Sequence, residues 1–130
     1  MPKSSLQAGL SVEKEFTVTE AMGTPHLATP VLATPFMIQM METVCRELLT
    51  QHLEEGEESV GFRVDIRHLA PARIGDTVVA SATLRQFTDG RKAIFDVAVN
   101  HTGGAKIGDG MHERRIIRQD RFAEGAPDRA

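Results

Sequence analysis

The sequence has no tryptophan or tyrosine and only one cysteine. A single thiol, Cys45, excludes a disulfide within the chain and predicts a reducing compartment, here the cytoplasm. No apolar run approaches the roughly 20 residues that a membrane-spanning helix needs, so no membrane partner is expected. No apolar run follows the N-terminal lysine either, so no signal peptide is expected. Because CxxC and HExxH spacings are also missing, the sequence predicts no metal site.

Positive charge is in short supply as well. The chain has 15 Lys and Arg against 18 Asp and Glu, a net charge of −3. A chain without a broad positive field is not expected to bind nucleic acid. Its 130 residues, 41% of them hydrophobic, are typical of one globular domain spanning residues 1–130. We expect the two ends, residues 1–10 and 119–130, to be flexible.

The segment from Thr34 to Leu53 predicts one long amphipathic helix. Pro35 suits the first helical position, and Thr34 is expected to cap the helix with its side-chain oxygen. Gly56 follows as a plausible C-cap. We interpret Cys45 as a small core residue, because it belongs to the apolar stripe of the helix. With successive residues 100° apart, that stripe contains Ile38, Met41, Cys45, Leu48, Leu49 and Leu53.

Outside this helix the hydrophobic period changes from 3.6 to 2, as in strands. In one of these segments, Val60, Phe62, Val64 and Ile66 are predicted to share a face. An Asp-Gly pair within 88–91 favours a hairpin connection, because it tolerates positive φ. Several antiparallel strands beside one helix indicate an α+β fold, with a five-stranded antiparallel sheet wrapped around the helix. The predicted strands are Val12–Thr19, Val60–Leu69, Thr77–Phe87, Lys92–His101 and Ile107–Arg118.

Two polar residues interrupt the apolar rows. Glu42 lies within the apolar stripe of the helix, where a carboxylate must find a partner, take up a proton or face a cavity. His68 continues the apolar row of the strand that follows the helix. Structural interpretations remain open: Glu42 could pair with Arg63 or Arg67, and His68 could be a hydrogen-bonded histidine at a strand end.

Three segments carry a resemblance to a known family. They are ATPFMIQMMETVCREL (33–48), EEGEESVGFRVDIRHLAPA (54–72) and IGDGMHERRII (107–117). They resemble the hotdog-fold acyl-CoA thioesterases, and in particular the fluoroacetyl-CoA thioesterase subgroup. Residues 68–84 are also similar to the Gly-Asp turn and strand of many hotdog proteins. The resemblance covers most of residues 33–117 and implies the hotdog fold.

The resemblance also implies site residues and partners. Thr34, Glu42 and His68 match the catalytic set of the subgroup, and two of these are the residues that interrupt the apolar rows. Gly61 matches a glycine beside the acyl group, and Arg114 matches the arginine of the last strand by motif, so both are expected to bind substrate. The family resemblance implies a homodimer or higher homo-oligomer, with acyl-CoA along the interface. It implies no cofactor other than the coenzyme A of the substrate.

The expected reaction is hydrolysis of a small acyl-CoA. Glu42 would act as base or direct nucleophile, His68 would relay a proton, and Thr34 would orient water or the carboxylate. Backbone N–H groups at the start of the helix could stabilise the oxyanion. Residues 20–33 depart from the subgroup, because they are short and lack an aromatic residue, so specificity for fluoroacetyl-CoA does not follow. The alternatives are an enoyl-thioester hydratase and a non-catalytic acyl-CoA-binding hotdog protein.

Overall fold

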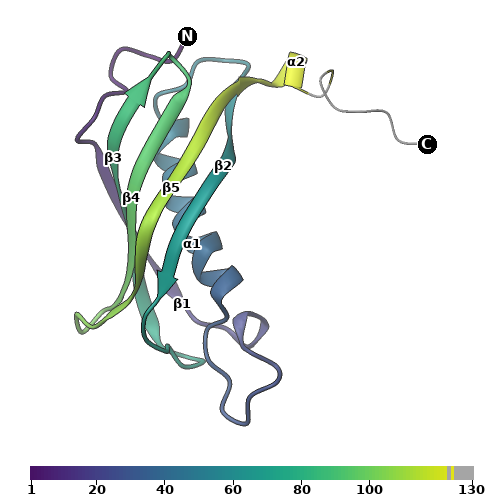
Figure 1. The fold of residues 1–130 in the computed structure, drawn as a ribbon, viewed down its shortest axis with the longest axis vertical. Helices are drawn as coiled ribbons and strands as arrows, with labels where there is room; N and C mark the ends of the chain where they lie inside the picture. The colour runs from purple at the N-terminus through teal and green to yellow at the C-terminus, as the bar shows by residue number, and fades with distance from the viewer. Residues whose placement is uncertain (123, 125–130) are drawn as a thin grey trace.

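The computed structural model describes residues 1–122 and 124, which form an antiparallel sheet bent around one long helix (Figure 1). The helix is α1 (Thr34–Thr50), and the sheet has the spatial order β1-β3-β4-β5-β2. The predicted α+β fold is therefore confirmed. The strands are β1 (Ser11–Thr17), β2 (Glu57–His68), β3 (Thr77–Thr88), β4 (Lys92–His101) and β5 (Lys106–Arg118).

Helix α1 is held against the sheet by an apolar core. Alternate residues of β3 and β4 face this core, among them Phe95 of β4, which is fully buried. Each large side chain buried in this way contributes about 1.5–3 kcal/mol. This core therefore fixes the position of α1 relative to the strands. Some of these strands carry polar side chains at the edge of the core. The buried residues of α1 are Met37, Met40, Met41, Val44, Cys45, Leu48 and Leu49.

Both ends of α1 differ from the prediction. Ala33 is the N-cap, and no side chain caps the helix. Thr34 is already helical, and its hydroxyl is used elsewhere, so its predicted capping role is wrong. The helix ends at Thr50 with Gln51 as C-cap, earlier than predicted. Gly56, with φ of +86°, instead lies in the turn before β2, so its predicted C-cap role is also wrong.

A β-bulge divides the apolar row of β2. The register of β2 against β5 shifts at Phe62, where one extra residue is inserted. Phe62 therefore lies on the outer face of the sheet, where the Arg115 guanidinium is 3.6 Å from its ring centroid. Val64, in contrast, pairs with His112, which faces the core. The prediction of one shared face for the apolar residues of this strand is therefore wrong.

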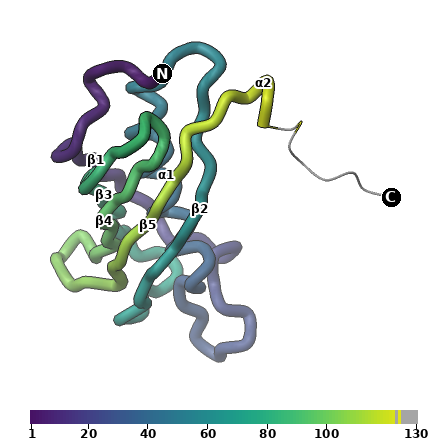
Figure 2. Tube along the Cα trace, turned by 45° about the horizontal axis from the view of Figure 1, so that its top comes forward, coloured from purple at the N-terminus to yellow at the C-terminus, as the bar shows by residue number. Residues whose placement is uncertain are grey.

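The segments outside the sheet pack at its two ends. Near the N-terminus, Leu6 is buried and the Lys3 N–H donates to the carbonyl of His52 at 2.8 Å. Residues 18–33 project beyond the N-terminal end of α1 (Figure 2). Of the C-terminal residues expected to be flexible, Gln119–Phe122 form a short helix, α2, while residues 123 and 125–130 lie outside the described residues. In the described part, no helix is long and apolar enough to cross a membrane.

Candidate active site

Thr34 and His68 meet at one end of the molecule. Thr34 is the first residue of α1 and His68 the last residue of β2. The Thr34 hydroxyl Oγ1 lies 2.8 Å from His68 Nδ1, a hydrogen bond whose direction depends on the imidazole tautomer. Thr34 is exposed and His68 half-buried. The structure therefore brings these two predicted residues together in a position that a substrate can reach.

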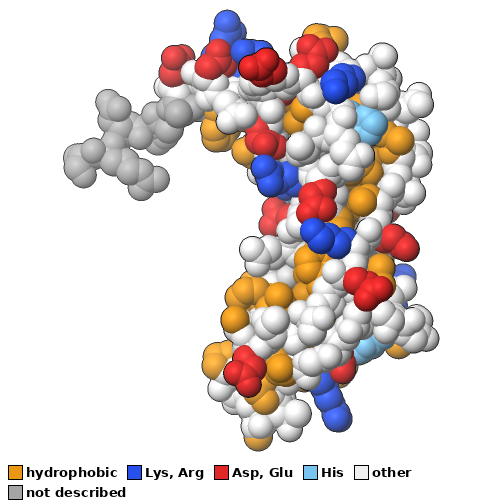
Figure 3. Space-filling model, turned by 180° about the vertical axis from the view of Figure 1, so that it is seen from behind, with side chains coloured by type: hydrophobic (Ala, Val, Ile, Leu, Met, Phe, Trp, Pro, Cys, Tyr) orange, Lys and Arg blue, Asp and Glu red, His pale blue; other side chains and the backbone are white. Residues whose placement is uncertain are grey.

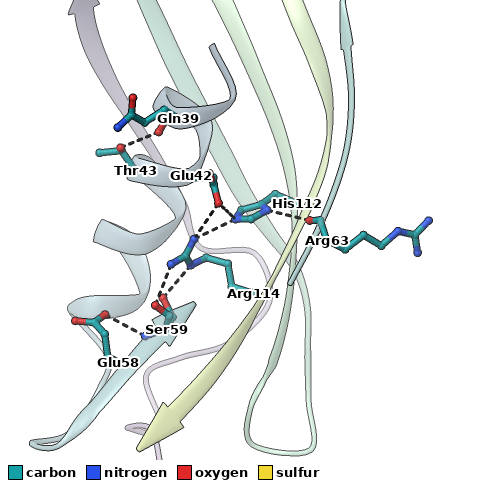
Figure 4. A network of polar contacts seen from close by, with 8 residues as sticks. All are labelled: Gln39, Glu42, Thr43, Glu58, Ser59, Arg63, His112 and Arg114. Carbon is teal, nitrogen blue, oxygen red and sulfur yellow. Dashed lines mark hydrogen bonds and ion pairs between the residues drawn. The ribbon is translucent and has the colours of Figure 1, made fainter. Parts of the chain in front are cut away.

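Glu42 lies further along α1, in a different cluster. Its Oε2 atom is 3.7 Å from His112 Nε2 and 3.7 Å from Arg114 Nη1, and both partners come from β5 (Figure 4). The Glu42 side chain remains 38% exposed, whereas those of His112 and Arg114 are 1% and 6% exposed. The carboxylate thus has buried partners on one side and open space on the other.

The two arginines that sequence alone offered as partners for Glu42 are not its partners. The side chain of Arg63 points away from the Glu42 cluster, and only its carbonyl takes part (Figure 4). Arg67 forms an ion pair with Asp109 at 3.1 Å. Arg67 and Asp109 line an open depression of about 700 Å³ on the outer face of the sheet. Hydrogen bonds from Lys106 and Arg67 hold the pKa of Asp109 below its ordinary value, so the charges there are already paired.

Each of the three guanidinium nitrogens of Arg114 has a hydrogen-bond partner. Its Nε donates to Ser59 Oγ at 2.9 Å, and Nη2 donates to the Ser59 carbonyl at 3.0 Å. Nη1 lies 3.2 Å from His112 Nε2. Burial lowers the pKa of Arg114, and the nearby charge of Glu42 opposes that effect. Because a guanidinium stays protonated in proteins, Arg114 supplies a fixed positive charge beside Glu42.

His112 is the main site residue that sequence reasoning missed. Its Nδ1 lies 3.0 Å from the carbonyl of Arg63, and burial, reinforced by the charge of Arg114, lowers its pKa. A histidine with a lowered pKa is neutral near neutral pH. The sequence pattern that could have identified His112 is the one that identified Glu42 and His68, namely a polar residue that interrupts an apolar row. In β5, His112 and Arg114 are polar residues at inward positions of a strand.

Gly61 leaves room for the carboxylate. A Cβ atom at this position would lie 2.8 Å from Glu42 Oε2 and 3.5 Å from the His112 ring. Gly61 also pairs with Arg114 across β2 and β5. Three predicted residues, Glu42, Gly61 and Arg114, are therefore brought together.

The Thr34–His68 pair and the cluster around Glu42 remain separate within one chain. Thr34 and Glu42 are eight residues apart on α1, which is a rise of about 12 Å along the helix axis. Among the described residues, no hydrogen bond or ion pair joins Glu42 to Thr34 or His68. No three His, Cys, Asp or Glu side chains of the described chain gather as metal ligands would. The site is therefore built from an acid cluster and a Thr–His pair.

One central helix wrapped by an antiparallel sheet is the arrangement of the hotdog fold. Solved structures share it. The fluoroacetyl-CoA thioesterase FlK superposes with a TM-score of 0.83 at 29% identity, covering 94% of this chain and 98% of FlK. A hypothetical protein of Thermus thermophilus, described as a thioesterase superfamily member, superposes with a TM-score of 0.83 at 31% identity, covering 91% and 88%.

Sequence comparison narrows the class to one family. The model of the family "Fluoroacetyl-CoA-specific thioesterase" matches residues 12–120. The fluoroacetyl-CoA thioesterase of Streptantibioticus cattleyicolor is 38% identical over 87 residues. That match covers 67% of this chain and 61% of the relative. The chain belongs to the fluoroacetyl-CoA-specific thioesterase family, which confirms the resemblance found in the sequence.

Proposed function

We propose that this protein hydrolyses a small acyl-CoA thioester to the free acid and coenzyme A. Membership of the family supports this activity, and the environment of Glu42 is the observation that carries it. The carboxylate is accessible, yet it lies 3.7 Å from a buried guanidinium. The positive charge of the guanidinium attracts the carboxylate and so holds it at this position. Thioester hydrolysis needs such a base or nucleophile near the carbonyl carbon.

Each of the site residues expected from the sequence has a role in this proposal. Glu42 activates a water molecule or attacks the thioester carbonyl directly. The hydrogen-bonded Thr34–His68 pair orients the attacking group and transfers a proton to the leaving thiolate. Backbone N–H groups at the start of α1 stabilise the developing oxyanion. Gly61 lets the acyl group approach β2. The positive charge of Arg114 keeps the Glu42 carboxylate in place.

A homodimer would join the two halves of the site. β2 is an edge strand on which Phe62 and Val64 are 61% and 43% exposed. The outline of the molecule is hollowed along this edge (Figure 3). Exposed edge strands are templates for pairing with another chain. If two β2 strands pair antiparallel about a two-fold axis at Val64, the His68 end of one strand runs beside the segment of the other strand that contains Gly61. Glu42 then faces the Thr34–His68 pair of its partner.

The proposal is tested by thiol release from a panel of acyl-CoAs that includes acetyl-CoA and fluoroacetyl-CoA. We expect wild type to release coenzyme A, and Glu42→Gln to lower kcat by about 100-fold or more. Glu47→Gln is the matched control, because Glu47 is an α1 glutamate paired with Lys14 at the surface. That variant should keep the wild-type rate.

Three outcomes of this experiment contradict the proposal. Full activity in Glu42→Gln would exclude the role of the carboxylate. Tight binding of acyl-CoA without thiol release would identify a binding protein instead. Loss of ultraviolet absorbance from an enoyl-CoA, with no thiol released, would identify a hydratase.

A further inference from the structure

His112 is the buried side chain that the proposed mechanism leaves without a role. Its Nδ1 lies 3.0 Å from the carbonyl oxygen of Arg63, at the bulge of β2. A carbonyl oxygen can only accept a hydrogen bond, so Nδ1 carries the proton and donates it. In a neutral ring the other nitrogen, Nε2, is then an acceptor. That nitrogen is directed between Arg114 and Glu42 (Figure 4).

The donors of Arg114 show what this acceptor does. Nε and Nη2 are each held by Ser59, through its hydroxyl and its carbonyl. Nη1 has two N–H groups, and His112 Nε2 lies 3.2 Å from it. Nη1 itself lies 3.7 Å from Glu42 Oε2, so its second N–H is the donor left for the carboxylate. The lone pair of His112 therefore completes the set of contacts that fixes the plane of the guanidinium.

A proton on Nε2 would reverse this contact. Two donors, Nε2–H and Nη1–H, would then point at each other inside a buried cluster, which is unfavourable. Burial opposes that protonation by lowering the pKa of His112. The ring thus stays in the one tautomer that accepts a hydrogen bond from Arg114.

We propose that His112 is a positioning residue that acts through Arg114. Its Nε2 accepts a hydrogen bond from Nη1 and thereby aims the guanidinium at the Glu42 carboxylate. This role rests on the proposed function, because it matters for rate only if Glu42 is the base or nucleophile. The positioning role predicts that substitutions of His112 change kcat rather than substrate binding.

Two substitutions separate the two nitrogens of the ring. His112→Gln places an amide oxygen near the position of Nε2 and keeps an acceptor for Arg114. His112→Asn places an amide N–H near the position of Nδ1 and keeps the donor to the Arg63 carbonyl. Each variant loses one hydrogen bond and some packing, so their thermal stabilities should fall alike. We expect His112→Gln to keep kcat within about threefold and His112→Asn to lose about tenfold or more, with KM little changed.

Nitrogen-15 NMR of wild type tests the geometry without reference to activity. We expect the Nδ1-protonated neutral tautomer of His112 at neutral pH. An Nε2-protonated or doubly protonated ring would overturn the assignment. Equal losses of kcat in the two variants, in step with their stabilities, would overturn the positioning role while leaving hydrolysis intact. A wild-type protein that releases no thiol would instead overturn the proposed function, and the positioning role with it.

Discussion

At the scale of single residues, Gly61 controls where the Glu42 carboxylate can lie. A Cβ at Gly61 would come within 2.8 Å of Glu42 Oε2, the mobile end of a side chain. We expect Gly61→Ala to fold, with stability changed by less than about 1 kcal/mol. The displaced carboxylate should lower kcat by about tenfold.

Steady-state thiol release and thermal unfolding of Gly61→Ala check this expectation. Gly9→Ala has no atom within 4 Å of its added Cβ, but its φ of +101° makes it a poor control. Gly103→Ala is better matched, because its Cβ would also meet nothing and its φ is not left-handed. Wild-type kcat in Gly61→Ala, or an unfolded protein, would contradict this explanation of Gly61.

The residues of the site differ in how far sequence could predict them. Glu42 and His68 each interrupt an apolar row, so periodicity alone identified them. Which arginine lies beside Glu42 depends on the pairing of β2 with β5, where Gly61 is opposite Arg114. The register between two strands cannot be predicted from the pattern of residues within either strand. Arg63 and Arg67 were therefore reasonable candidates, and Arg114 was found through its motif.

At the scale of elements, the way α1 begins predicts how substitutions of Thr34 affect stability and activity. A side chain that caps a helix contributes about 1 kcal/mol to stability, but Thr34 makes no such bond and instead contacts His68. Because Thr34 is exposed, we expect Thr34→Ala to change the free energy of unfolding by no more than about 0.5 kcal/mol. Its kcat should fall clearly, and Thr34→Ser should keep most of the activity.

This prediction is tested by measuring urea unfolding and thiol release for Thr34→Ala and Thr34→Ser. A loss of 1–2 kcal/mol on Thr34→Ala, the amount expected of a true N-cap, would show that the hydroxyl serves the helix. Unchanged kcat with unchanged stability would show that it serves neither the helix nor the site.

The elements themselves followed from periodicity, and their irregularities did not. Asp89 and Gly90 have φ of 58° and 70°, as the predicted hairpin between β3 and β4 requires. The bulge at Phe62 breaks the alternation that sequence reasoning assumed. In β5, Gly110 allows the backbone of β2 to approach closely, because an added Cβ would meet backbone atoms of Asp65 and Ile66.

At the scale of the whole molecule, the two edges of the sheet differ. β1 carries the exposed charged residues Glu13, Lys14 and Glu15, and such residues discourage pairing with another chain. β2 exposes Phe62 and Val64 instead. The order of one helix and several strands predicted the fold, because few other arrangements cover an amphipathic helix. Assembly was not readable from periodicity within one chain, since it depends on which edge stays free.

The central claim is that Glu42 of one copy acts on the same thioester as the Thr34–His68 pair of another. Its most direct test is a heterodimer of one Glu42→Gln chain and one His68→Ala chain, co-expressed with two different tags and purified by both. In a two-fold dimer with a shared site, one of the two sites regains all of its groups, so kcat per dimer should recover to about half of wild type. Each parent homodimer should be nearly inactive. If each chain uses its own Glu42 and His68, the heterodimer will be as inactive as its parents, and the account is wrong.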